Sequence, residues 1–467
     1  MKTLILAVMV ISVLSIGLSG VSAQDNTPMV SVRDQLVVNG TVTITEAYSE
    51  GPGFIVIHVD NDGSPGPVAG FAAIPAGHSQ NIVVEIDTTM ATPILYAMLH
   101  EDTGEPGVYE FGTVEGADGP VAVDGNVVAP SFPIILIDVS DQFVNENTVT
   151  INSAVYALDG WVVVHSGDAE TFGNVIGFAF IEAGNTSDVV VELNEPATTV
   201  LWAMVHVDDS EAGVYEFGEV PNADGPIVLR GGVATAPFWT QPHVVVNEQI
   251  VLHGDGMEMM DEASSLVAES VLSDGPGWLV VHADGGGQPG PVLGQTQVAA
   301  GLNTDVVVEL SGDITPVVYP MLHTDTGEEG VYEFGTVEGA DGPVSVDGSV
   351  VTFPVNIAPS IMISETSGLT GSTVIVDGAL IDADGWLVIH ASNEGAPGPV
   401  LGQAPLKAGF NSNIAVQIDA EGAGSEVIPM LHYDTGEAGV YEFGSVEGAD
   451  APVIFGGAPV IIQLGLE

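Results

Sequence analysis

Cysteine is absent from this 467-residue chain, so neither a disulfide bond nor a thiolate ligand can stabilise its fold. The domains must therefore be held together by apolar packing, and Val, Ile, Leu and Ala are abundant enough for this. A blue-copper centre is also excluded, because such a centre needs a cysteine ligand.

Basic residues are nearly absent. Four Lys and Arg stand against 63 Asp and Glu, which gives a formal net charge of -59. A field of this sign repels nucleic acid and anionic lipid, so we expect neither as a partner. The charge leaves two interpretations open: the solvated acidic surface of an extracellular or salt-adapted protein, or a surface with specific cation sites.

Long hydrophobic runs are absent beyond the N-terminus. The first residues combine the basic Lys2, an apolar run over 4–18 and small residues at 21–23, which is the pattern of a secretory signal peptide over 1–23. No later run approaches the about 20 apolar residues that a membrane-spanning helix needs. We therefore expect a secreted chain without a membrane span, which is extracellular or associated with the cell surface.

No window shows a helical period, and the dominant signal is a repeat. The sequence Gly-Val-Tyr-Glu-Phe-Gly occurs four times, starting at Gly107, Gly213, Gly330 and Gly439. An apolar run that ends in His precedes each copy, at 54–58, 161–165, 278–282 and 386–390. This regularity predicts four tandem units after the signal peptide, at 24–131, 132–240, 241–354 and 355–467.

The apolar runs within a unit are short, rich in β-branched residues and bounded by Gly, Pro, Asp and Asn, which is typical of strands and turns. In the first unit we expect strands at 30–32, 41–47, 54–59, 68–73, 82–86, 93–100 and 121–128. This number of short strands favours an immunoglobulin-like sandwich. The predicted fold class is all-β, with four tandem immunoglobulin-like β-sandwich domains.

Two further features concern the connections. The third unit carries an insert at 253–264 that contains Met257, Met259 and Met260. The Pro-containing junctions at 129–133 and 236–239 predict short, fairly stiff connectors. We expect separate units in a row, with limited bending between them.

These blocks together resemble a known family. The His-ending strand, the Ala76-Gly77 turn before a strand at 83–85, the His-x-Asp-Thr-Gly segment and the Asp-Gly-Pro turn are similar to a secreted repeat domain of unknown function. That domain occurs in surface proteins of halophilic archaea and some bacteria. The resemblance covers all four units. It implies an extracellular β-sandwich and supplies no activity.

Eight of the eleven histidines fall at two equivalent positions in each unit, such as His58 and His100 in the first. An Asp stands two residues after the second of these, on the same face of the strand. A His beside a carboxylate can bind a divalent metal, with the carboxylate as a further ligand or as a hydrogen-bond partner. The candidate metal ligands are His58, His100, Asp102, His165, His206, Asp208, His282, His323, Asp325, His390, His432 and Asp434.

Whether the two histidines of a unit converge depends on the strands between them. If 68–73 is a strand, three antiparallel reversals separate the histidine strands, and we expect their ends at opposite poles, too far apart to share an ion. If 68–73 is a loop, both ends fall at one pole and a shared ion becomes feasible. A third interpretation is structural, with each His bonded to backbone at a strand end.

The pattern requires no cofactor, and two ions fit parts of it. Copper suits the Met98-Leu-His100 segment and its repeats. Calcium suits the acidic turns at 60–63 and 102–105, although neither matches the alternating acidic loop of an EF-hand. The plainer interpretation is a turn in which Asp and Gly are favoured. The repeated aromatic residues, including Phe54, Tyr109 and Phe111, are expected in the core.

Catalytic motifs are missing, since the chain contains no nucleophile elbow, no His-Glu-x-x-His and no phosphate-binding loop. Tandem copies multiply binding surface or length. We expect a non-enzymatic extracellular protein with a structural, surface or adhesive role, whose partners are cell-envelope or matrix components. The alternative is a secreted divalent-metal-binding protein with one His/Asp site per repeat. The sequence predicts no oligomeric state.

Overall fold

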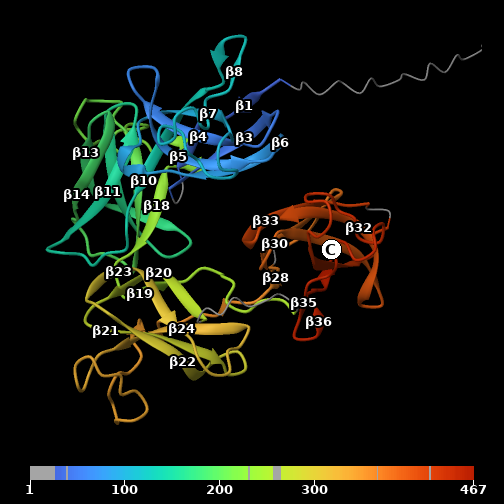
Figure 1. The fold of residues 1–467 in the computed structure, drawn as a ribbon. Coiled ribbons are helices and arrows are strands. Elements are labelled where there is room, and N and C mark those ends of the chain that lie inside the picture. The colour runs from blue at the N-terminus through green and yellow to red at the C-terminus, as the bar shows by residue number, and fades with distance from the viewer. Residues whose placement is uncertain are drawn as a thin grey trace, which may run out of the picture.

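The computed structural model describes residues 27–37, 40–229, 232–255, 264–364, 367–419 and 422–466. The predicted signal peptide and the three methionines of the insert lie outside these residues. In the described part the regular elements are all strands apart from one short 3-10 helix, η1 (Thr88–Met90). None of the helices there is long and apolar enough to cross a membrane. Figure 1 shows four β-rich units in chain order from blue to red.

The first unit is a sandwich of two antiparallel sheets. Its strands are β1 (Met29–Ser31), β2 (Gln35–Val37), β3 (Thr41–Ser49), β4 (Gly53–Asp60), β5 (Pro65–Ile74), β6 (Gly77–Glu85), β7 (Ile94–Glu101), β8 (Ala122–Val123) and β9 (Asn126–Val127). One sheet has the order β1-β3-β6, and the other pairs β5, β4, β7 and β10 (Ser131–Asp138). This arrangement confirms the predicted all-β, immunoglobulin-like sandwich.

The second unit repeats this plan. It contains β11 (Thr148–Tyr156), β12 (Gly160–Gly167), β13 (Phe172–Ile181), β14 (Gly184–Glu192), β15 (Val200–Val207), β16 (Val228–Leu229), β17 (Gly232–Val233) and β18 (Thr235–Trp239). The sheet that carries its two histidines has the order β13-β12-β15-β18, which corresponds to β5-β4-β7-β10 in the first unit.

The third and fourth units show the same order again, β22-β21-β24-β27 and β32-β31-β34-β37. The third contains β19 (His243–Val245), β20 (Ser265–Ser273), β21 (Gly277–Asp284), β22 (Pro289–Val298), β23 (Gly301–Glu309), β24 (Val317–Thr324), β25 (Ser345–Val346), β26 (Ser349–Val350) and β27 (Val355–Asn356). The fourth contains β28 (Ser360–Met362), β29 (Gly368–Thr370), β30 (Thr373–Ile381), β31 (Gly385–Asn393), β32 (Ala396–Leu406), β33 (Gly409–Gln417), β34 (Glu426–Tyr433), β35 (Ile454–Phe455), β36 (Ala458–Pro459) and β37 (Leu464–Gly465).

The core of each sandwich is built from alternate residues of facing strands. In the first unit Ile44 of β3 joins Ile55 and Ile57 of β4 and Leu99 of β7 in one fully buried cluster. Burial of such a side chain contributes about 1.5–3 kcal/mol. The core therefore uses only every second residue of β4.

The remaining residues of β4 are buried as well. Phe54, Val56 and His58 lie on the opposite face of the strand, outside the core cluster, and each is at most 5% exposed. The segment 102–121, which follows β7 and is called here the covering loop, packs over this outer face and carries the Gly-Val-Tyr-Glu-Phe-Gly sequence. A continuous apolar run results because both faces of the strand are buried.

The prediction of one continuous strand at 121–128 is wrong. Those residues form the small hairpin of β8 and β9, whose turn places Asp124 and Gly125 at φ 51° and 82°. An Asp-Gly pair with two positive φ values is the usual two-residue hairpin turn. The edge strand of the sandwich is β10, so the predicted boundary after residue 131 falls inside a strand.

Strand β10 belongs to two units at once. Ser131–Pro133 pairs with β7 of the first unit, and Leu136–Asp138 pairs with β11 of the second. Ile134–Leu136 also pairs in parallel with β2. The first junction is thus part of two sheets, and it is more than the short connector that we expected.

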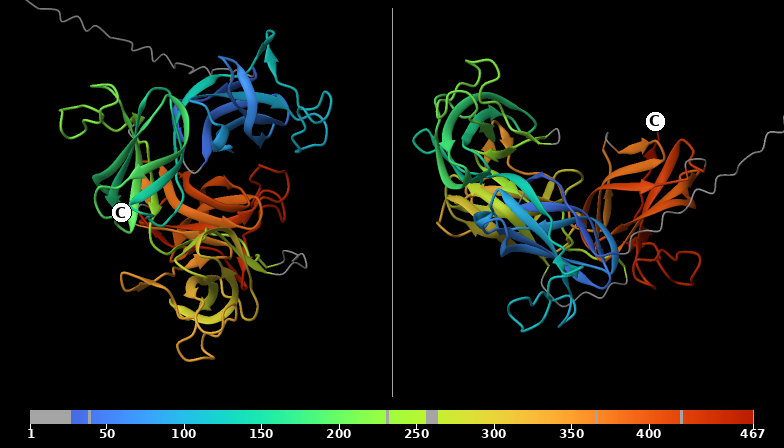
Figure 2. Two further views of the ribbon diagram at one scale, coloured as in Figure 1. Left: turned by 90° about the vertical axis from the view of Figure 1, so that its left-hand side faces the viewer. Right: turned by 90° about the horizontal axis from the view of Figure 1, so that it is seen from above.

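The other junctions have contacts of their own. Trp239 and His243 place their ring centres 4.0 Å apart between the second and third units. The start of the insert reaches the fourth unit, where Gly254 N donates to Asp382 at 2.7 Å and Asp255 accepts from Gly457 N at 2.7 Å. Figures 1 and 2 show the four units in a bent array.

Candidate functional site

The two repeated histidine positions of each unit meet on the outer face of the second sheet, the face that the covering loop packs against. In the first unit β4 and β7 are antiparallel neighbours, with Phe54 opposite His100 and His58 opposite Tyr96. The ring centres of His58 and His100 are nevertheless 5.8 Å apart. The corresponding distances in the other units are 5.8, 5.7 and 5.7 Å.

The expectation that opposite strand ends keep these histidines apart is therefore wrong. Residues 65–74 do form a strand, so three reversals separate β4 from β7, as one of the two alternatives required. The side chains converge above the Val56–Met98 pair, which lies between the two histidine positions in the register. Because both imidazole side chains lie on the same face of the sheet, their rings approach each other although the C-terminal ends of the two strands are far apart.

A β-bulge accompanies the first histidine in every unit. The pairing of β4 with β5 shifts register on both sides of His58, and the same shift occurs at His165, His282 and His390. A bulge bends the strand and redirects a side chain, and bulges are frequent beside functional sites. Its presence in all four units ties this distortion to the histidine position.

Each histidine is held by one backbone carbonyl. His58 Nδ1 donates to Gly66 O and His100 Nδ1 donates to Asp118 O, both at 2.7 Å. The six equivalent bonds measure 2.7–2.9 Å. Because a carbonyl oxygen only accepts, Nδ1 must carry the hydrogen and Nε2 must present a lone pair in the neutral ring.

The Nε2 atoms are buried and point away from water. Six of them have no hydrogen-bond partner, in His58, His100, His165, His282, His323 and His390. The other two lie against a methionine sulfur, with His206 Nε2 3.3 Å from Met204 Sδ and His432 Nε2 3.1 Å from Met430 Sδ. Each of these methionines stands two residues before the second His, on the same face of its strand.

Burial keeps the second histidine of each unit neutral. It lowers the pKa of His206, His323 and His432 to about 4, and it also lowers the pKa of His100. Desolvation penalises the charged ring more than the bond to the carbonyl favours it. At neutral pH these rings therefore offer an unprotonated nitrogen.

The covering loop is organised by one buried aspartate. The Asp118 carboxylate accepts from Thr103 N at 2.8 Å and from Glu110 N at 2.5 Å, and its backbone oxygen holds His100. Asp118 is fully buried and adopts a φ of 48°. Its counterparts Asp224, Asp341 and Asp450 are also fully buried, with φ values of 47°, 49° and 48°.

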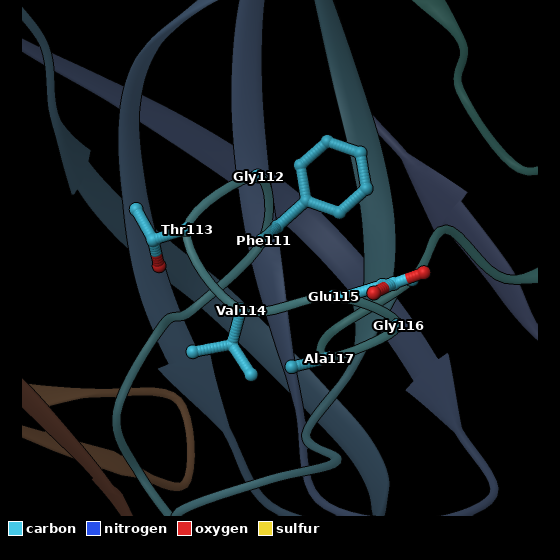
Figure 3. A pocket seen from close by; sticks show the side chains of 8 residues that line it. Phe111, Gly112, Thr113, Val114, Glu115, Gly116 and Ala117 are labelled. Atoms are coloured by element: carbon cyan, nitrogen blue, oxygen red, sulfur yellow. The ribbon is translucent and has the colours of Figure 1, made fainter.

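The aromatic residues of the loop cover the histidines. Tyr109 packs edge-on against Phe54 with ring centres 5.2 Å apart, and Phe111 packs edge-on against His100 at 4.9 Å. Phe111 is 41% exposed, so its expected place in the core is wrong. Figure 3 shows Phe111 together with residues 112–117 of the covering loop, which line a shallow hollow.

The carboxylates proposed as metal ligands are used within the loop. Asp102 accepts from Gly107 N at 2.8 Å, and Asp208, Asp325 and Asp434 accept from Gly213, Gly330 and Gly439. Over the described ranges no group of three or more His, Cys, Asp or Glu lies close enough to hold a metal. The residue that accompanies the histidines is methionine, and the Met-x-His spacing on a strand is the sequence signal for it.

In the acidic turn at 60–63, one of the two considered for calcium, the Asp60 carboxylate accepts hydrogen bonds from nearby protein groups. Asp60 Oδ1 accepts from Gly63 N and from Tyr96 Oη, both at 3.1 Å. Asp62 and Gly63 have φ values of 51° and 81°, as a tight turn requires. The structure thus gives this segment the geometry of a turn.

Two cell surface glycoproteins are similar to parts of this chain. Cell surface glycoprotein 2 of Haloarcula hispanica is 32% identical over 117 residues, which are 24% of this chain and 12% of that glycoprotein. Cell surface glycoprotein 1 of the same organism is 31% identical over 206 residues, 40% of this chain and 21% of that glycoprotein. The chain therefore spans only a small part of the length of these two relatives.

A solved tetra-tandem repeat from the extending region of a large adhesion protein covers 94% of this chain and 100% of its own, at 12% identity and a TM-score of 0.16. The model of a domain family of unknown function (DUF7282) matches residues 28–134, 136–238, 256–358 and 359–465. The four family matches and the two glycoproteins confirm the resemblance drawn from the sequence. Since the four family matches cover most of the chain, the protein belongs to this family, with the domain of unknown function repeated four times.

Proposed function

We propose that the protein is a non-enzymatic, extracellular component of the cell surface, in which four sandwiches form one connected acidic array. The observation that carries this proposal is the continuity between units. Strand β10 pairs with both the first and the second unit, and Asp255 joins the insert of the third unit to the fourth. A chain built to space or cover a surface benefits from such connections.

The relatives support the same role. Both are cell surface glycoproteins of a haloarchaeon, and each matches this chain over one or two repeat lengths. The formal charge of -59 suits a protein that meets water and salt directly. Four copies of one unit multiply length and exposed surface, as is usual for tandem-repeat proteins.

The test is the location of the protein on native cells. We expect antibodies raised against the folded chain to label intact cells, and the protein to sediment with the envelope fraction. A cytoplasmic protein that stays unlabelled on the same cells is the control for leakage. A chain that is found freely soluble and monomeric in the medium, with nothing retained on the envelope, would contradict the proposal.

A further inference from the structure

We infer that each unit binds one monovalent copper ion between the Nε2 atoms of its two paired histidines and the Sδ atom of the adjacent methionine. The four sets are His58, Met98 and His100; His165, Met204 and His206; His282, Met321 and His323; and His390, Met430 and His432. We call each set a His–Met cluster. This activity goes beyond the proposed surface role and does not depend on it.

The spacing of the imidazoles fits a shared ion. Two imidazoles that bind one metal through Nε2 at about 2.0 Å have ring centres at most about 6 Å apart. The observed separations are 5.8, 5.8, 5.7 and 5.7 Å. The same distance in four units of different sequence indicates that it is maintained.

The hydrogen bonds of the histidines prepare them as ligands. A metal-binding imidazole usually donates its other N–H to a carbonyl or carboxylate, which fixes the tautomer and the ring orientation. His58 and His100 donate Nδ1–H to Gly66 O and Asp118 O, so that Nε2 is left free. Both side chains are at most 5% exposed.

Most of the buried Nε2 atoms lack a hydrogen-bond partner. Leaving a buried polar atom without a partner is unfavourable, and six such nitrogens occur at equivalent positions. In the remaining two, Nε2 faces the sulfur of Met204 or Met430 at 3.3 and 3.1 Å. A deprotonated nitrogen and a thioether sulfur both present lone pairs, so a cation between them would satisfy both.

The chemistry of the donors selects the ion. Two imidazoles and a thioether form a neutral, soft ligand set, and thioether sulfur favours Cu(I) over hard divalent cations. No carboxylate joins the cluster within the described residues, so a divalent ion would keep its whole charge in a buried place. A single positive charge costs less there, and calcium, which prefers carboxylate ligands, would find none among the described residues of the cluster.

The direct test is a metal titration of the mature chain. Cu(I), supplied anaerobically as its acetonitrile complex and buffered by bicinchoninate, is added in potassium sulfate, which avoids chloride. We expect four Cu(I) per chain. With Ag(I) as the air-stable probe, the Nε2 resonances of the eight paired histidines should shift in 15N NMR spectra, and those of His78 and His243 should stay in place.

A matched pair of variants separates the cluster from other methionines. In the quadruple variant M98L, M204L, M321L and M430L, leucine keeps the buried volume and removes the sulfur. We expect its Cu(I) affinity to fall at least about tenfold, with the circular dichroism spectrum unchanged. The control M90L/M362L, whose methionines lie outside the clusters, should bind like the natural chain.

Three results would overturn the inference. They are less than one Cu(I) bound per folded chain, an unchanged affinity in the quadruple variant, and tighter binding of Zn(II) than of Cu(I) at the paired histidines. If the quadruple variant fails to fold, the Ag(I) shifts of the natural chain decide the question. Absence of those shifts then counts against the clusters.

Discussion

A single buried aspartate links the covering loop to the histidine in each unit. Asp118 combines a left-handed φ, a fully buried carboxylate and a backbone oxygen that holds His100. Asn and Asp tolerate this backbone conformation better than other residues with a Cβ atom. The residue therefore determines the loop geometry and the histidine tautomer together.

Replacing Asp118 should loosen the loop in a graded manner. Asp118→Ala leaves the amides of Thr103 and Glu110 without an acceptor and places alanine at a φ of 48°, which together should cost about 2–4 kcal/mol. Asp118→Asn keeps one acceptor and should cost less. Amide hydrogen exchange at Thr103 and Glu110 measures both effects. The exposed hairpin residue Asp124, replaced by Asn, is the control, and equal exchange in all three variants would refute the role of Asp118.

The junction between the second and third units contains a pH-sensitive residue. Burial against Trp239 lowers the pKa of His243 to about 4, below its ordinary value of 6.5. The unfolded state therefore binds more protons between pH 6.5 and 4, and the stability that is complete above pH 6.5 is lost as the pH falls through this window.

Urea unfolding at pH 6.5 and pH 4.5 tests this expectation. His243→Phe keeps the ring contact with Trp239 and removes the titration, so the variant should lose less stability on acidification than the natural chain. The carboxylates titrate equally in both proteins and cancel in the comparison. The same pH dependence in both would show that His243 does not contribute.

At the scale of elements, the strand that carries the first histidine of each unit (β4, β12, β21 or β31) is buried on both faces, and this explains which features the sequence could predict. The runs that became β3, β4, β5 and β7 of the first unit were expected close to their observed bounds, because their apolar residues are clustered between turns. Strand β6 begins at Gly77, well before the expected residue 82, because its first residues are polar. Periodicity alone could not say that Phe54 and His58 face a loop instead of the core, since a strand buried on both faces has no alternation.

The candidate site was predicted in part for the same reason. The histidines were recognisable as a repeated pair, yet their convergence depends on side-chain directions and on a bulge at His58 that no sequence pattern announced. The carboxylate of Asp102 looked like a ligand from its spacing, and a contact with Gly107 N, five residues further along, uses it instead. Loop contacts of this kind are decided by tertiary packing.

An insertion into β10 should separate the first two units. Gly-Ser-Gly placed between Pro133 and Ile134 interrupts a strand that pairs with β7 on one side and β11 on the other. We expect the melting temperature to fall by about 5 °C and the radius of gyration in solution scattering to rise. The same insertion between Asp124 and Gly125, in the exposed turn of the β8–β9 hairpin, is the control. Equal effects at both places would contradict the special role of β10.

At the scale of the whole molecule, the large negative charge affects stability. With 63 acidic and four basic residues, repulsion between carboxylates opposes the folded array at low ionic strength. Salt shortens the distance over which these charges act from about 10 Å at 0.1 M to about 3 Å at 1 M. The melting temperature should therefore rise steeply between these concentrations of potassium chloride. Sucrose, which does not screen charge, is the control, and a melting temperature that is flat in salt would contradict this account.

The two faces of β4 have separate tasks, and this gives the repeat an unusual freedom. Ile55 and Ile57 build the sandwich core, whereas His58 belongs to the His–Met cluster beneath the loop. A substitution on the outer face can therefore disable one cluster while its unit still folds and keeps its length. The number of copper ions that the array binds and the length of the array can therefore change independently. A single substitution changes the first, and the gain or loss of a whole repeat changes the second.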